Sequence, residues 1–263
     1  MSRDQDLLSP LLTAARQAGR LIMEIYDSGF VVRDKADQSP VTAADEQAEA
    51  YLLAVLAELT PDIPVISEEA AAAGTLPTVG DCFWLVDPLD GTKEFIKRNG
   101  EFTVNIGLIR NLRPVLGVIH APAMGRSFWG VTAQGEAPAQ AWEQREGEAP
   151  RPLSIRIPPA EGLTITTSRS HRAPERLEAF LAKRAVAGHL NAGSSLKFCL
   201  IAAGEADCYP RLGPTCEWDI CAGQAILEAA GGSVVQFEDG KPMVYGKAPK
   251  YLNPDFIAWG HQG

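Results

Sequence analysis

The sequence predicts a layered α+β protein, and three observations lead to this class. Amphipathic helices open the chain, short β-rich runs separated by Gly and Pro occupy its middle, and helices and strands are mixed in its second half. The mixture lacks the regular alternation of a doubly wound parallel sheet, and no internal repeat is present. With 263 residues, of which 46% are hydrophobic, the chain is long enough to bury a substantial core. We therefore expect two packed α/β subdomains.

The first half of the chain contains two helices followed by short strands. Apolar residues recur at helical spacing over residues 5–26 and 43–59, and Pro61 ends the second of these helices. Runs of β-branched, aromatic and other apolar residues predict the strands that follow, at residues 64–66, 83–86, 102–109, 115–120 and 127–131. Residues 133–152 have little apolar pattern, so we expect a surface excursion or hairpin that leads to a domain junction near residue 155.

The second half of the chain mixes both element types. The pattern predicts strand 163–167, helix 173–187, helix 194–203, strand 206–209, helix 218–230 and strand 233–237. The expected division places residues 1–154 in an N-terminal subdomain and residues 155–263 in a C-terminal one.

Composition excludes several classes of function. A net charge of −9 and a pI near 5.0 argue against binding a nucleic acid polymer, which needs a basic face. No apolar stretch approaches the ~20 residues that span a bilayer, and the N-terminus lacks the apolar core of a signal peptide, so we expect a cytoplasmic protein. The five cysteines are odd in number and lack zinc-site spacing, which predicts reduced thiols.

The segment WLVDPLDGT, residues 84–92, carries the strongest chemical signal. A buried strand is expected to end before Asp87, Pro88 should block further ladder pairing, and Asp90 and Gly91 form a turn pair ahead of a helix that Thr92 opens. Two carboxylates on one rigid turn can face one pocket, and such oxygen ligands suit Mg²⁺ or Mn²⁺. The alternative is that these residues are turn signals and that Asp90 caps the helix.

Two other acidic sites also lie at the ends of elements. Glu68 and Glu69 follow the short apolar run 64–66, and Asp219 opens the apolar helix that follows Trp218. Taken singly, the glutamates are more typical of a solvated charge pair and Asp219 of an N-cap. Because α/β layers place ligand sites at element ends, their joint occurrence favours a metal site instead.

At these residues the sequence resembles the inositol monophosphatase superfamily of Mg²⁺-dependent, lithium-sensitive phosphatases. The motifs that carry the resemblance are SEEA at 67–70, DPLDGT at 87–92 and EWDICAGQAILEAAGG at 217–232, and the similarity extends from about residue 35 to 232. It implies the α/β/α/β/α sandwich of the inositol monophosphatase and fructose-1,6-bisphosphatase type.

Within this superfamily the chain is similar to the CysQ-type 3'(2'),5'-bisphosphate nucleotidases. The matching stretches are residues 35–45, 90–109, 168–172 and 193–219, and Ile220-Cys221 departs from the usual Thr-Ala. The resemblance implies hydrolysis of adenosine 3',5'-bisphosphate (PAP) to AMP and phosphate, with its sulfated analogue (PAPS, to APS) as a further substrate, in support of sulfate assimilation. It also leaves open a peripheral association with the cytoplasmic face of the inner membrane.

The resemblance also implies roles for particular residues. The metal ligands would be Glu68, Asp87, Asp90, Asp219 and the backbone carbonyl of Leu89, around two or more Mg²⁺ ions for which Mn²⁺ can substitute. The catalytic residues would be Asp45, Thr92 and Glu68: Asp45 would polarise Thr92, and Thr92 with a metal would activate the attacking water. The substrate would contact Leu89, Asp90, Gly91, Thr92 and Asp219 at the scissile phosphate, and His171, Ser194, Lys197 and Arg211 at the second phosphate and nucleoside.

Residue chemistry alone supports part of this assignment. A Thr–Asp pair can relay a proton, although each residue is also a common helix cap. Lys197 lies three positions after Ser194 on a predicted helix, so both can face one anion. The expected partner is a small phosphate ester, and the oligomeric state stays open. Two alternatives stay open as well: a phosphatase acting on inositol monophosphate or another small sugar phosphate, and a non-catalytic metal- or anion-binding scaffold.

Overall fold

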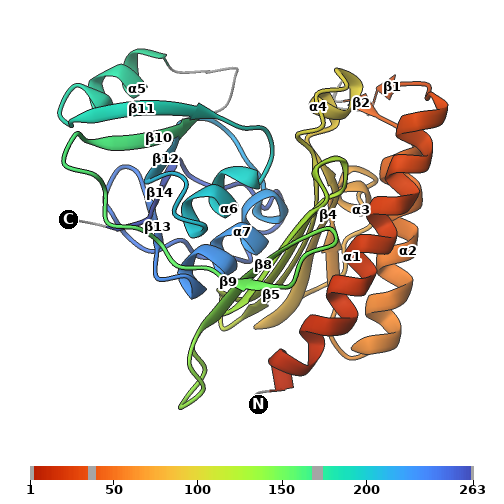
Figure 1. Cartoon of the computed structure of the whole chain (residues 1–263). Helices are drawn as coiled ribbons and strands as arrows, with labels where there is room; N and C mark the ends of the chain where they lie inside the picture. The colour runs from red at the N-terminus through yellow and green to blue at the C-terminus, as the bar shows by residue number, and fades with distance from the viewer. Residues whose placement is uncertain (1–2, 35–39, 168–173, 262–263) are drawn as a thin grey trace.

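Helices and sheets alternate in layers through the molecule (Figure 1). The computed structural model describes residues 3–34, 40–167 and 174–261. In order, the layers are helices α1 and α2, a seven-stranded sheet, helices α6 and α7, a five-stranded sheet, and helix α5. The predicted layered α+β class is confirmed.

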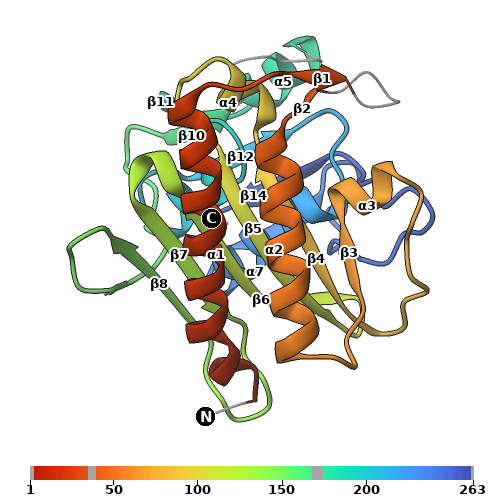
Figure 2. The ribbon, with the colours of Figure 1, turned by 90° about the vertical axis from the view of Figure 1, so that its right-hand side faces the viewer.

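Helices α1 (Arg3–Ser28) and α2 (Ala43–Leu59) lie side by side on the outer face of the seven-stranded sheet (Figure 2). Their apolar stripes bury Leu11, Ile22, Leu52 and Leu56 against sheet residues such as Trp84. Removing this apolar surface from water contributes about 25 cal/mol per Å². The sequence predictions of both helices are confirmed, including the end of α2 before Pro61.

The seven-stranded sheet follows chain order. Its strands are β3 (Val65–Ser67), β4 (Cys82–Asp90), β5 (Thr103–Arg110), β6 (Arg113–Ala121), β7 (Arg126–Val131), β8 (Gln140–Arg145) and β9 (Arg151–Pro152). Strands β3 and β4 are parallel and the remaining neighbours are antiparallel. The 133–152 region contains the β8–β9 hairpin. Short elements at the margins are α3 (Glu68–Ala72), α4 (Thr92–Ile96), η1 (Pro122–Met124) and the ribbon of β1 (Arg33–Asp34) with β2 (Pro40–Val41).

The predicted end of β4 is wrong. The strand was expected to stop at Val86, because Pro88 cannot donate a ladder hydrogen bond, yet β4 continues to Asp90, which pairs with Thr103. The pairing register shifts between Asp87 and Asp90, so Pro88 lies in an irregularity where its missing N–H removes no ladder bond. This irregularity allows both aspartates to remain on the strand while the backbone bends between them.

The middle layer brings helix α7 (Glu217–Ala229) unusually close to the sheet. Gly107 on β5 and Gly117 on β6 make this possible: a Cβ atom at Gly117 would lie 2.2 Å from the carbonyl oxygen of Ala222, and one at Gly107 would lie 2.3 Å from Cys221 Sγ. Helix α6 (Leu196–Ala202) packs beside α7. The close approach fixes the N-terminus of α7, and therefore Asp219, relative to β4 and β5.

The five-stranded sheet has the order β11-β10-β12-β14-β13. Its strands are β10 (Leu163–Thr167), β11 (Val186–Asn191), β12 (Cys208–Arg211), β13 (Ser233–Gln236) and β14 (Phe256–Trp259), and α5 (Pro174–Leu181) packs on its outer side through Phe180. The predicted helix 173–187 is wrong at its C-terminal end: α5 ends at Leu181, and Val186–Asn191 is an edge strand whose alternating residues are exposed. Strand β14 was not predicted.

Two further expectations concern the whole chain. No disulfide joins the five cysteines, all of which lie within the described ranges. Among the described residues, none of the helices combines the length and the apolar character needed to span a bilayer.

Candidate active site

The residues predicted to bind metal gather where β3 and β4 end. The parallel register pairs Ser67 with Val86, so Glu68 and Asp87 directly follow two paired positions. Asp87 is buried, and its Oδ1 accepts a hydrogen bond of 3.0 Å from the backbone N–H of Leu89. A buried carboxylate with a neighbouring acidic residue is costly unless cations or hydrogen-bond donors compensate it. A cation bound at this end of the sheet would offset this cost.

Asp90 connects the sheet to the loop before α6. Its Oδ2 accepts hydrogen bonds of 2.7 Å from Ser194 Oγ and from the backbone N–H of Ser195, and one of 3.2 Å from Asn105 Nδ2. Ser195 Oγ also lies 2.7 Å from Asp90 Oδ2 and 2.6 Å from the carbonyl oxygen of Asp219, and its single proton can serve either. Asp90 is thus held in a fixed orientation by residues distant in sequence.

Asp219 enters the same region from helix α7. It forms a capping box with Cys216, whose backbone N–H donates to Asp219 Oδ2 at 2.8 Å. Burial raises the pKa of the Asp219 carboxyl well above its usual range, and the negative charges of Asp90 and Glu68 raise it further. Ser195, whose Oγ contacts both the Asp90 carboxylate and the carbonyl oxygen of Asp219, joins the end of β4 to the start of α7. The alternative interpretation of Asp219 as the N-cap is wrong, because Cys216 occupies that position and Asp219 is the third helical residue of the capping box. The metal-ligand role of Asp219 stays a prediction.

The donor chemistry of this cluster fits a hard divalent cation. Carboxylates and a backbone carbonyl are the oxygen ligands that Mg²⁺ and Mn²⁺ prefer, and a cation would relieve the repulsion that raises the Asp219 pKa. Within the ranges that the structure describes, no group of three or more acidic, histidine or cysteine side chains is arranged so that it could hold a metal ion. Asp87, Asp90 and Asp219 instead accept hydrogen bonds from backbone amides and neighbouring side chains.

Asp45 and Thr92 form the predicted pair. Asp45 lies in the first turn of α2, where its Oδ2 accepts hydrogen bonds of 2.8 Å from both the N–H and the Oγ1 of Thr42. Its other oxygen, Oδ1, accepts a hydrogen bond of 3.3 Å from Thr92 Oγ1. The carboxylate therefore caps its own helix and also reaches the threonine at the start of α4. Because Asp45 is only 1% exposed, its contact with Thr92 is shielded from water.

The segment from Leu89 to Thr92 forms a tight turn. Gly91 has φ of +96°, a conformation that favours glycine, and a Cβ atom there would lie 3.2 Å from the carbonyl oxygen of Glu101. The carbonyl oxygen of Leu89 is 3.4 Å from Thr92 Oγ1. Leu89, Asp90, Gly91 and Thr92 thus form one tight segment between the carboxylates and α4.

The residues predicted to select the substrate lie differently from the expectation. Ser194 was predicted on a helix with Lys197, but α6 begins only at Leu196, and Ser194 has φ of +54° in the preceding loop. Its hydroxyl faces Asp90 and Thr103 rather than an open anion site. The Nζ of Lys197 donates to the carbonyl oxygens of Ala192 and Ser194, and the residue is 3% exposed.

Burial lowers the pKa of Lys197 to about 8, an effect that Asp90 opposes and Arg211 reinforces. Arg211, at the end of β12, donates from Nη2 to the carbonyl oxygen of Pro214 at 3.0 Å, and its charge acts on both Lys197 and Asp219. Two cations and the acidic cluster are therefore within electrostatic range of one another. His171 lies outside the described residues.

Sequence reasoning missed the residues that hold the acidic cluster in place. Glu49 on α2 accepts hydrogen bonds from Ser67 Oγ and, at 3.1 Å, from the N–H of Ala70, and so fixes the strand-to-helix turn that carries Glu68. Asn105 and Ser195 similarly bind Asp90. The only signal for these residues in the sequence is a polar residue within an otherwise apolar segment, such as Asn105 within β5.

The layered fold and the acidic cluster together define a phosphatase family. The inositol monophosphatase family model matches residues 4–259, and the chain therefore belongs to this family. Among curated relatives, the 3'(2'),5'-bisphosphate nucleotidase CysQ of Escherichia coli K12 is 44% identical over 252 residues, covering 95% of this chain and 98% of that protein. The CysQ nucleotidase of Haemophilus influenzae is 33% identical, covering 100% of this chain and 96% of that protein.

Solved structures of proteins in this family are similar to this chain as well. The structure of CysQ from Bacteroides thetaiotaomicron, described as a bacterial member of the inositol monophosphatase family, is 37% identical with a TM-score of 0.75 and covers 95% of each chain. An inositol monophosphatase from Anabaena is 26% identical with a TM-score of 0.76, covering 98% of this chain and 92% of that one.

Proposed function

We propose that this protein is a 3'(2'),5'-bisphosphate nucleotidase that hydrolyses PAP to AMP and phosphate, with PAPS as a further substrate that yields APS. The observation that carries the proposal is the hydrogen-bond network that joins Asp90, Asp219 and the buried cation Lys197. Ser195 contacts the Asp90 carboxylate and the carbonyl oxygen of Asp219, and Lys197 donates to the carbonyl oxygen of Ser194, whose hydroxyl binds Asp90. The acidic residues suit metal-assisted hydrolysis, and a cation beyond them suits a substrate with a second phosphate. The 44% identity to nucleotidases over 95% of the chain supports this choice of substrate.

Members of this family are metal-dependent, and we assign Mg²⁺ as the cofactor, with two or more ions bound and Mn²⁺ as a substitute. The proposed ligands are Glu68, Asp87, Asp90, Asp219 and the carbonyl oxygen of Leu89. When bound, the cations lower the pKa of water and stabilise negative charge on the phosphate and the leaving oxygen. Inhibition by lithium is a further expectation for this family.

The chain's own residues orient the reactants. Asp45 accepts the hydrogen bond of Thr92 Oγ1, which leaves the threonine oxygen free to accept a hydrogen bond from the attacking water. The segment from Leu89 to Thr92 would contact the scissile phosphate. Lys197 and Arg211 would neutralise the second phosphate, and we retain Ser194 and His171 as candidates for contacts with the nucleotide.

This assignment gives different roles to two parts of the chain. Residues 1–154 would form a subdomain that supplies most metal ligands and the Thr92–Asp45 pair. Residues 155–263 would supply Asp219 and the residues that select the substrate. Helix α7, which packs on β4, β5 and β6, physically joins the two contributions.

Parallel phosphate-release assays test the proposal. We expect Mg²⁺-dependent release from PAP with a kcat/KM at least tenfold higher than from inositol 1-phosphate. Equal values for the two substrates would contradict the nucleotidase assignment while preserving the phosphatase class. Release from neither substrate, with folded protein and saturating Mg²⁺, would contradict both and favour a binding scaffold.

A further inference from the structure

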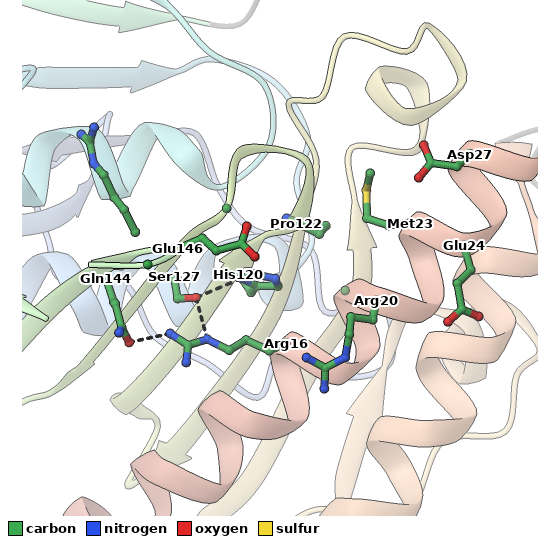
Figure 3. Close-up of a pocket in the computed structure, with 14 residues that line it drawn as sticks. Arg16, Arg20, Met23, Glu24, Asp27, His120, Pro122, Ser127, Gln144 and Glu146 are labelled. Atoms are coloured by element: carbon green, nitrogen blue, oxygen red, sulfur yellow. Dashed lines mark hydrogen bonds between the residues drawn. The ribbon is translucent and has the colours of Figure 1, made fainter. Parts of the chain in front are cut away.

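A cavity of about 510 Å³ lies beside helix α1, bordered by the end of β6 and by the turn that joins β8 to β9 (Figure 3). None of its lining residues belongs to the candidate active site. Pockets that hold small organic molecules typically measure roughly 300–1,000 Å³, so the cavity is large enough for more than an inorganic ion.

A fixed polar wall forms one side of this cavity. Arg16 Nε donates to Ser127 Oγ at 3.2 Å, and Arg16 Nη2 donates to Gln144 Oε1 at 2.7 Å. Ser127 is buried, and its hydroxyl lies 3.0 Å from His120 Nδ1. These neutral partners orient the Arg16 guanidinium without neutralising its charge. The group is therefore already positioned for an anion, which lowers the entropic cost of binding one.

The two arginines of α1 on this wall bind neutral partners. Among the described residues, neither Arg16 nor Arg20 forms an ion pair with a carboxylate, and Arg20 Nε donates to the neutral Gln17 Oε1 at 2.8 Å. Burial and the nearby charge of Arg20 both lower the pKa of Arg16. By contrast Arg145, which also lines the cavity, lies 3.4 Å from the carboxylate of Glu143. A bound anion would relieve the repulsion between Arg16 and Arg20.

Other parts of the cavity lining are acidic or apolar. Glu24 and Asp27 lie further along α1 than the two arginines, and Met23 and Pro122 add apolar surface (Figure 3). A third carboxylate of the lining, Glu146, lies near Ser127 and His120. These acidic residues disfavour a ligand that is negatively charged along its whole length. The arrangement therefore selects a molecule with one anionic group and an uncharged remainder, which differs from the bisphosphate proposed for the active site.

We propose that this cavity is a second ligand site, which binds a small phosphate monoester with its phosphate between Arg16 and Arg20 and its uncharged body against Met23 and Pro122. Guanidinium groups match phosphate oxygens with paired, charge-assisted hydrogen bonds. Two such groups on adjacent turns of one helix, four residues apart, can contact the same phosphate.

The test uses phenyl phosphate as the probe and calorimetric titration as the readout. The full-length chain is titrated without added divalent cation, because the negative charges of the acidic cluster at the candidate active site then repel phosphate. We expect the variant Arg16→Gln/Arg20→Gln to bind phenyl phosphate at least tenfold more weakly than the wild type. The control variant Arg113→Gln/Arg176→Gln removes the same charge from surface ion pairs and should bind within twofold of the wild type.

The outcomes separate the possibilities. Failure of the wild type to bind, or equal weakening in both double variants, would overturn the proposal. Equal affinity for phenol and phenyl phosphate would overturn the assignment of an anionic group. If removal of the Arg16 hydrogen bonds prevents folding, Arg20→Gln alone replaces the double variant, because its guanidinium contacts Gln17 in an exposed position. At least threefold weaker binding is then expected, and an unchanged affinity would contradict the site.

Discussion

Substitution of Asp45 by asparagine tests the proposed role of this residue separately from its role as a cap. In the wild type, Oδ2 accepts hydrogen bonds from Thr42 and Oδ1 accepts one of 3.3 Å from Thr92 Oγ1. An asparagine that keeps its oxygen toward Thr42 presents an N–H₂ group to Thr92. The threonine must then accept rather than donate in this contact, which uses one of its two lone pairs. It also loses the hydrogen bond to a carboxylate that makes its oxygen a better acceptor for the attacking water.

The size of the effect follows from the strength of a hydrogen bond to a carboxylate. A hydrogen bond to a charged group contributes about 1.5–3 kcal/mol, which corresponds to a roughly 10- to 100-fold fall in kcat if the bond acts in the transition state. Asp45 is not a proposed metal ligand, so the Mg²⁺ concentration that gives half-maximal activity should change less than twofold. The assay is steady-state phosphate release from PAP across a Mg²⁺ titration.

Thr42→Ala is the matched control, because it removes the cap partner and leaves the Thr92 hydrogen bond in place. Loss of an N-cap threonine should lower the free energy of unfolding by about 1 kcal/mol with kcat nearly unchanged. The reasoning is refuted if folded Asp45→Asn retains kcat within twofold of the wild type. It is also refuted if Thr42→Ala loses as much kcat as Asp45→Asn.

Three further predictions follow. Lys197→Met should raise the KM for PAP at least tenfold while changing the KM for a monophosphate such as inositol 1-phosphate less than threefold. Equal changes in the two KM values would argue against an interaction of Lys197 with the second phosphate. Gly117→Ala should lower the free energy of unfolding in urea by about 1–3 kcal/mol, because its Cβ would lie 2.2 Å from a backbone oxygen of α7. Gly80→Ala, with open space around it, should be nearly neutral, and similar losses in both variants would contradict the close packing. Burial lowers the pKa of His120 from 6.5 to about 4, so the unfolded chain binds more protons between these pH values, and the free energy of unfolding should fall by up to about 3 kcal/mol as the pH drops through this window. Urea unfolding at pH 7 and pH 4.5 should show a smaller drop for His120→Gln than for the wild type, and an equal drop would count against a neutral buried His120.

Local signals predicted the parts of the site that depend on neighbours in sequence. The positions of Asp87 and Asp90 followed from a buried apolar run that ends in Pro and Gly, and the start of α2 followed from its helical period. These features are set by backbone sterics and side-chain periodicity within a few residues, so the sequence carries them directly.

The rest depended on contacts between distant segments. Nothing near Asn105 or Ser195 in the sequence indicates that both bind Asp90, because β5 and the loop before α6 meet it only in the folded protein. The predicted helix 173–187 included the first two residues of β11, and the rest of this strand was not predicted, because only alternate residues of this edge strand are partly buried. Strand β14 is short and follows an irregular segment, so it was not predicted either. The continuation of β4 past Pro88 required knowledge of the register shift opposite β5.

The most direct test of the proposed nucleotidase activity is ³¹P NMR of the products formed from PAP. With Mg²⁺ and the wild type, we predict loss of the 3'-phosphate resonance, growth of free phosphate and retention of the 5'-phosphate resonance of AMP. Asp90→Asn, or omission of divalent cation, should abolish this change. Loss of the 5'-phosphate instead, or an unchanged spectrum with folded wild-type protein and Mg²⁺, would contradict the assignment.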